Sequence, residues 1–193
     1  MLINEAGLVR AMKSAFKHGG YAVSNQGSMV AIYTENWYVQ TTRALLPRKV
    51  LVTIVEHMGM IPEVNVPVSI LKDEDPQLIL KEVAADEMDH WCGGERGEEA
   101  TMVPVIMQGY QIFQPPGGGA CWGVPLLYLG MVDRDAAEHT GADVVDNDRL
   151  LWEADGEAVV IDATRKAKTS WAKECERAVW TALEGVDLHK EGA

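Results

Sequence analysis

The first twenty positions place apolar residues at the spacing of about 3.6 residues that an α-helix requires. The apolar stripe consists of Leu8, Met12, Ala15 and Phe16. Asn4 can accept the free N–H groups at the start of a helix, and Gly19-Gly20 is typical of the point where one ends. We therefore predict a helix over about residues 4–17.

The following residues alternate with the shorter period of β-strands. Strands are predicted at residues 21–24, 28–34 and 37–42. The first two flank Asn25-Gln26-Gly27, which is a turn sequence. Pro47 suits the first turn of a second helix that ends at Gly59. The β-branched residues within 50–55 also permit a strand there.

Residues 64–71 are predicted to form a further strand. Asp75-Pro76 is a helix-start signal, and the predicted helix ends near Gly93-Gly94. The stretch 93–100 combines glycines with charged residues and is the best candidate for a linker.

Turn sequences divide the second half of the chain into hairpins. The glycine-rich residues 115–119 separate strand-like stretches at 102–114 and 121–133, and Asp155-Gly156 separates strands at 148–154 and 158–162. The chain closes with a predicted helix over about 169–183. Its apolar face consists of Trp171, Cys175, Ala178, Val179 and Ala182.

These elements predict an α+β fold, because successive strands joined by tight turns pair in the antiparallel sense. We expect mainly antiparallel sheets with three to four helices, and the C-terminal amphipathic helix packed on the strand-rich second half. The length of 193 residues is consistent with a single domain, 1–193, with a possible subdivision at 93–100.

Composition narrows the class of protein. Hydrophobic residues make up 47% and charged residues 24%, which is ordinary for a globular protein. No apolar run approaches the roughly 20 residues of a membrane helix, and residues 1–5 do not resemble a signal peptide. The three cysteines, Cys92, Cys121 and Cys175, form no CxxC pair. We expect a cytoplasmic protein with reduced thiols.

The net charge of −12 is concentrated in two blocks. Residues 71–100 hold ten acids and three bases, a net charge of −7, and residues 133–162 hold ten acids and two bases, a net charge of −8. This field repels a phosphate backbone, so nucleic acid is an unlikely partner. The aromatic and basic residues of 21–49 could stack on single strands, but residues 1–70 carry a net charge of only +2.

Two motifs could support chemistry but are incomplete. Glu87 and His90 lie at the helical spacing i, i+3, as in metal-binding bundles, yet no second such pair occurs in the sequence. Cys121 follows a glycine-rich loop, but the loop has neither the Lys-Ser/Thr nor the helix start of a phosphate loop. An exposed acidic helix face and a hairpin tip are the simpler interpretations.

A third motif lies in residues 141–183. Asp146 and Asp148 precede the 155–156 hairpin, and a hydrophobic strand then ends at Asp162. This stretch resembles the core of the PD-(D/E)xK nuclease superfamily, in particular the RecB-like nucleases. The resemblance implies Asp148 or Asp146 and Asp162 as magnesium ligands.

The motif departs from that family at its lysine. Thr164 stands where the family has lysine, so Lys166 or Lys168 would have to reach the site. The candidate catalytic residues are then Asp148, Asp162 and Lys166. The candidate metal ligands are Asp148, Glu157 and Asp162.

Because no motif is complete, we favour a non-catalytic cytosolic protein that acts through protein–protein contacts. Six Trp and nine Met offer adaptable apolar contact area. The partner is another protein or a second copy of the chain, through an exposed strand or the last helix, and no cofactor is predicted. The alternatives are the metal-dependent enzyme just described, with Mg²⁺, and an acidic mimic of nucleic acid that blocks a basic site.

Overall fold

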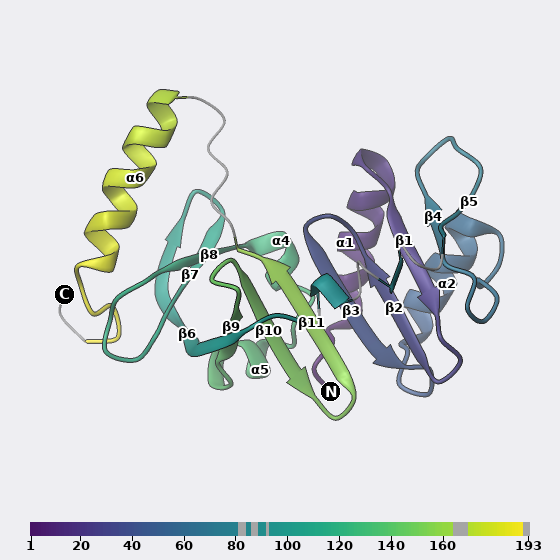
Figure 1. Cartoon of the computed structure of the whole chain (residues 1–193), viewed down its shortest axis with the longest axis horizontal. Helices are drawn as coiled ribbons and strands as arrows, with labels where there is room; N and C mark the ends of the chain where they lie inside the picture. Colours follow the sequence, from purple (N-terminus) through teal and green to yellow (C-terminus); the bar gives the residue numbers. More distant parts are fainter. Residues whose placement is uncertain (81–83, 86–88, 92, 164–169, 191–193) are drawn as a thin grey trace.

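The computed structural model describes residues 1–80, 84–85, 89–91, 93–163 and 170–190. Its dominant feature is a sheet of 11 strands in the order β5-β4-β1-β2-β3-β11-β10-β9-β6-β7-β8 (Figure 1). The strands are β1 (Tyr21–Asn25), β2 (Met29–Tyr33), β3 (Trp37–Thr42), β4 (Val68–Ile70), β5 (Gln77–Leu78), β6 (Arg96–Met107), β7 (Tyr110–Gln114), β8 (Trp122–Pro125), β9 (Ala142–Val145), β10 (Arg149–Ala154) and β11 (Glu157–Asp162). Every described ladder is antiparallel.

The two halves of the chain meet where β3 pairs with β11. The register places Val39 opposite Val159 and Tyr38 opposite Val160, although these residues are about 120 positions apart in sequence. Alternate side chains of both strands point to opposite faces of the sheet. The apolar pairs therefore bury both faces at the centre of the molecule.

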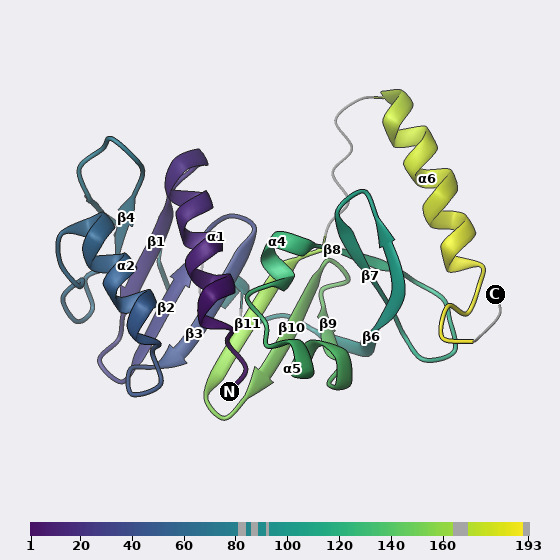
Figure 2. The same ribbon diagram turned by 180° about the vertical axis from the view of Figure 1, so that it is seen from behind.

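Helices cover one of these faces (Figure 2). They are α1 (Glu5–His18), α2 (Arg48–Met58), α4 (Leu126–Leu129) and α5 (Arg134–His139). Asn4 caps α1, since its Oδ1 accepts the N–H of Gly7 at 3.1 Å. The main core lies between these helices and the sheet, with Leu8, Met12, Ile54, Trp37 and Trp152 among its most buried side chains.

The opposite face of the sheet carries a smaller apolar cluster. Tyr33, Tyr38 and Val160 project from it and are covered by Trp91, whose ring centroid lies 6.4 Å from that of Tyr38. Residues 89–91 are helical. Within the described residues, every helix is too short or too polar to span a lipid bilayer.

The predicted fold class was wrong in the helices. The structure has one large antiparallel sheet with more and shorter helices than the three to four expected. The C-terminal helix α6 (Ser170–Glu184) does not cover the strand-rich half but stands at its side (Figure 1). Ala178, Val179 and Ala182, three residues of the face predicted to be buried, are exposed.

Two local predictions of secondary structure were wrong. Asp75-Pro76 was predicted to start a helix, but the strand β5 follows it directly. Residues 121–133 were predicted to form one strand, but β8 ends at Pro125 and the short helix α4 begins at Leu126. The apolar run in residues 121–133 has no period that distinguishes a strand from a buried helix. Pro125, which ends the strand, was therefore the more informative residue.

The buried amide of Gln114 holds the end of α6 and the residues after it. Its Nε2 donates to the carbonyl oxygens of Val186 at 2.9 Å and Gly119 at 3.2 Å, and its Oε1 accepts the N–H of Leu188 at 2.9 Å. Trp180, which is 5% exposed, packs beside this amide against β6, β7 and Cys121. Among the described side chains of α6, Trp180 and Leu183 therefore provide the contact with the sheet. The side chains of Trp171 and Cys175, which were predicted on the buried face, lie outside those described.

We predict that Gln114→Ala loosens this attachment. The backbone groups of residues 186–188 lose their partners, so the free energy of unfolding should fall by about 2 kcal/mol in urea titrations. Hydrogen exchange at residues 186–189 should accelerate. Gln26→Ala, at an exposed turn, is the control and should change both quantities much less. Equal exchange rates in the two variants would contradict this role for Gln114.

Candidate functional site

A cleft of about 600 Å³ lies between the C-terminal end of α1, the β2–β3 turn and residues 69–79. Tyr128 of α4 closes one side. This volume is in the range of small-molecule and peptide-side-chain sites, which is roughly 300–1,000 Å³. The cleft is larger than a second hollow of about 100 Å³, which Val23, Leu51 and Ile54 help to line, and we treat it as the candidate site.

Aromatic residues lie along the cleft on both faces of the sheet, Tyr21 and Trp37 on the helix-covered face and Tyr33 on the opposite face. Tyr21, Tyr33 and Trp37 are between 1% and 3% exposed, so their positions are fixed by the packing behind them. Tyr128 is half-buried. Burial raises the pKa of Tyr128, and the negative charges of Glu35 and Asp162 add to this effect together with Tyr110. Tyr128 therefore stays neutral at physiological pH.

The β2–β3 turn is held in place by two sets of hydrogen bonds. The Thr34 hydroxyl accepts the N–H groups of Asn36 at 3.0 Å and Trp37 at 3.3 Å. From the neighbouring strand, the N–H of Asp162 donates to the carbonyl oxygen of Asn36 at 3.0 Å. The turn that carries Glu35 is therefore anchored to the end of β11.

Three exposed carboxylates stand on the rim of the cleft. Glu35 comes from the β2–β3 turn, and Glu74 and Asp75 come from the segment before β5. Among the lining residues the basic side chain is His18, whose Nδ1 lies 2.9 Å from the carbonyl oxygen of Ser14. The rim of the cleft is therefore negatively charged.

Tyr21 makes a polar contact with His57, a residue that does not line the cleft. The Tyr21 hydroxyl lies 3.0 Å from Nδ1 of His57, and the His57 ring stacks on Phe16 with centroids 3.9 Å apart. Burial raises the pKa of Tyr21. The pKa of His57 is lowered from 6.5 chiefly by burial, with Lys13 acting in the same direction and Glu56 opposing it.

The structure separates Glu157 from the other two acidic residues of the nuclease-like motif. In the β10–β11 ladder Arg149 lies opposite Asp162, and the N–H of Ala163 donates to the carbonyl oxygen of Asp148 at 2.8 Å. Asp148 and Asp162 therefore lie at the same end of this hairpin. Glu157 begins β11 at the other end, about 17 Å away at the usual rise per residue. Lys166 and Lys168 lie outside the described residues.

Glu157 and Arg149 have structural contacts instead. Oε2 of Glu157, which is 3% exposed, accepts the N–H of Leu2 at 2.5 Å and so holds the N-terminal segment against the sheet. The buried guanidinium of Arg149 is paired with Asp146 and lies 3.4 Å from an oxygen of Asp148. Among the described residues, no three His, Cys, Asp or Glu side chains are grouped so that they could hold a metal ion.

The remaining candidates lie apart from the cleft. Glu87 and Cys92 fall outside the described residues, and the side chain of His90 is exposed. Cys121 is fully buried under Trp180, and the amide of Gln114 lies 3.4 Å from its sulfur.

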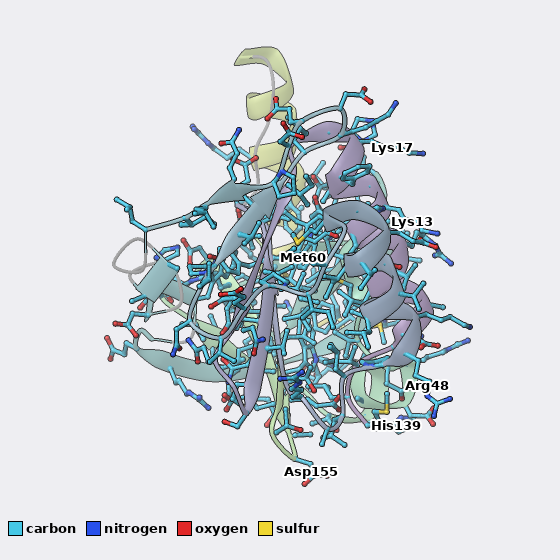
Figure 3. All side chains as sticks on the ribbon, turned by 90° about the vertical axis from the view of Figure 1, so that its right-hand side faces the viewer. Lys13, Lys17, Arg48, Met60, His139 and Asp155 are labelled. Carbon is cyan, nitrogen blue, oxygen red and sulfur yellow. The ribbon has the colours of Figure 1, made fainter. Side chains whose placement is uncertain are left out.

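The aromatic and basic residues of 21–49 do not form one surface. Tyr38 is on the face of the sheet opposite the helices, whereas Arg48 projects outward from the helical layer together with Lys13 and Lys17 of α1 (Figure 3). Lys49 is paired with Glu5 at 3.5 Å.

Sequence reasoning did not identify the cleft. Its residues come from four separate segments, and none has a recognisable spacing. The available signal was Glu35 in a turn between strands that carry Tyr33 and Trp37. That pattern is too common to indicate a site.

The sequence matches no protein-family model and no curated protein. Among solved structures, a protein assigned as a DNA polymerase III beta subunit from Eubacterium rectale is similar in fold, with a TM-score of 0.37 and 9% sequence identity. The similarity covers 89% of this chain and 66% of that chain, so this chain spans just under two thirds of the other protein's length. A likeness this loose carries no weight for function.

We predict that His57 makes stability fall in mild acid. Because its pKa is lowered in the folded state, the unfolded state takes up a proton first as the pH drops below about 6.5. Thermal melts from pH 7.5 to pH 5 should show a smaller loss of stability in His57→Gln than in the wild type. His139→Gln, at the exposed end of α5, should keep the wild-type slope; a slope unchanged in both variants would contradict the prediction.

Proposed function

We propose that this protein acts without catalysis and binds a partner protein through the cleft. The observation that carries the proposal is a preformed cleft of about 600 Å³ with three exposed carboxylates on its rim. A cleft that is already formed in the free protein binds a partner at a lower entropic cost than one that must first be ordered.

The residues that line the cleft favour binding over catalysis. The described lining residues include no cysteine, lysine or arginine, and Nδ1 of the one histidine, His18, lies against a backbone carbonyl. The carboxylates Glu35 and Asp75 are exposed to water, where a carboxyl group is a weak general acid or base at neutral pH. The residues therefore suit recognition better than proton transfer.

The surroundings of the cleft favour a polypeptide over nucleic acid. The negative rim repels phosphate groups. Leu78 and Leu80 are 77% and 70% exposed beside it, and large apolar side chains exposed next to a cleft are typical of a protein interface. The partner is proposed to cover these leucines together with the opening of the cleft.

Photo-crosslinking in the native host cells tests this proposal. With p-benzoylphenylalanine in place of Gln77, which lines the cleft, we expect adducts with another polypeptide. The same group in place of Asp155, at a hairpin tip well outside the cleft, is the control (Figure 3).

Filling the cleft should abolish the Gln77 adducts. Ser14→Trp and Ser69→Trp each place a large ring in the cleft from a different element, with melting temperatures checked against the wild type. Adducts that persist in both folded variants, or that form equally from position 155, would contradict the proposal.

A further inference from the structure

The strand β5 ends the sheet at the side remote from α6 (Figure 1). Its described ladder pairs Leu78 with Val68 and Gln77 with Ser69 of β4. A strand at the edge of a sheet presents backbone N–H and C=O groups on its outer side, and an extended peptide can pair with them. β5 is therefore a place where a partner could continue the sheet.

Side chains around β5 alternate between the cleft and solvent. Gln77 and Ile79 line the cleft, whereas Leu78 and Leu80 are exposed. A segment paired with β5 would cover the exposed leucines with every second side chain and direct the others toward the cleft opening. The geometry thus links the edge strand to the cleft.

The negative charge on the cleft rim indicates the kind of partner side chain that the cleft could bind. Glu74 and Asp75 directly precede β5, and Glu35 faces the cleft from the β2–β3 turn. A carboxyl oxygen of Glu74 accepts a hydrogen bond from Gln77 at 3.3 Å, and one of Glu35 accepts from Asn36 at 3.3 Å, which leaves acceptor capacity on both groups.

We infer that the partner supplies an extended segment that pairs with β5 and places a lysine or arginine side chain in the cleft, between Glu35 and the pair Glu74 and Asp75. This rests on the proposed function and specifies the chemistry of the partner. The aliphatic stem of the basic side chain packs in the cleft beside the half-buried Tyr128, and its charged end meets the carboxylates. The net charge of −7 over residues 71–100 steers such a segment toward this edge.

Selection from a displayed library of random dodecapeptides tests the inference. Peptides are selected on the full-length protein and counter-selected on Ser14→Trp and on Ser69→Trp, so that those retained depend on the cleft. We expect the retained peptides to carry Lys or Arg beside alternating apolar residues. The affinity of these peptides should be about tenfold lower for E35Q/E74Q/D75N than for the wild type. Raising the salt concentration should weaken binding to the wild type more than binding to this variant.

Matched controls separate charge from location and backbone pairing. E63Q/D135N/D155N removes three exposed carboxylates away from the cleft and should bind the peptides as the wild type does. Methylating alternate backbone nitrogens of a selected peptide should weaken binding about tenfold, because a ladder hydrogen bond is lost each time.

The outcomes are distinct. Cleft-dependent peptides that lack basic residues, that bind E35Q/E74Q/D75N as tightly as the wild type, or that tolerate methylation at every backbone nitrogen would overturn the inference and leave the proposed function standing. A failure to retain any cleft-dependent peptide would count against the proposed function itself, and against the inference with it.

Discussion

The pairing of β3 with β11 is the contact on which the rest of the structure depends. It joins residues about 120 positions apart, so the chain must offset a large loop-closure entropy before this ladder can form. Burial on both faces provides that free energy. Val39 and Val159 contribute to the core under the helices, and Tyr38 and Val160 contribute to the cluster on the other face.

The ladder also positions the cleft. The last residue of β11, Asp162, donates its N–H to Asn36 and so holds the β2–β3 turn that carries Glu35. Tyr128, which follows β8 far along the chain, meets the same turn across the cleft. Residues from both halves therefore form one preorganised surface, and preorganisation lowers the entropic cost of binding a partner.

How much the sequence predicts depends on whether the signal is local. Asn4 and Gly19 bounded α1 correctly to within one residue, and the Asp155-Gly156 turn gave the β10–β11 hairpin. The predicted face of α6 was wrong at Ala178, Val179 and Ala182, which are exposed, whereas Trp180 is the buried residue among the described side chains of this helix. Trp180 does not belong to the periodic apolar stripe, so the stripe alone could not predict which residue of α6 contacts the sheet.

The site required information that no local pattern contains. Glu35, Glu74 and Tyr128 meet only after β4, β5 and β11 have added to the sheet on either side of β1–β3. The motif at 141–183 showed the reverse problem. Asp148, Glu157 and Asp162 are close in sequence, but the extended geometry of β11 separates Glu157 from the other two. Proximity along a strand is therefore a poor guide to a shared site.

Native-state hydrogen exchange measured by NMR tests the central claim most directly, namely that the long-range ladder and the cleft turn form one cooperative unit. The amide of Asp162, bonded to Asn36, should exchange with the same free energy of opening as the amides of β3 and β11, close to the global free energy of unfolding. An Asp162 amide that exchanges through a much smaller opening free energy, while the ladder stays protected, would show that the turn and its carboxylate are not held by β11.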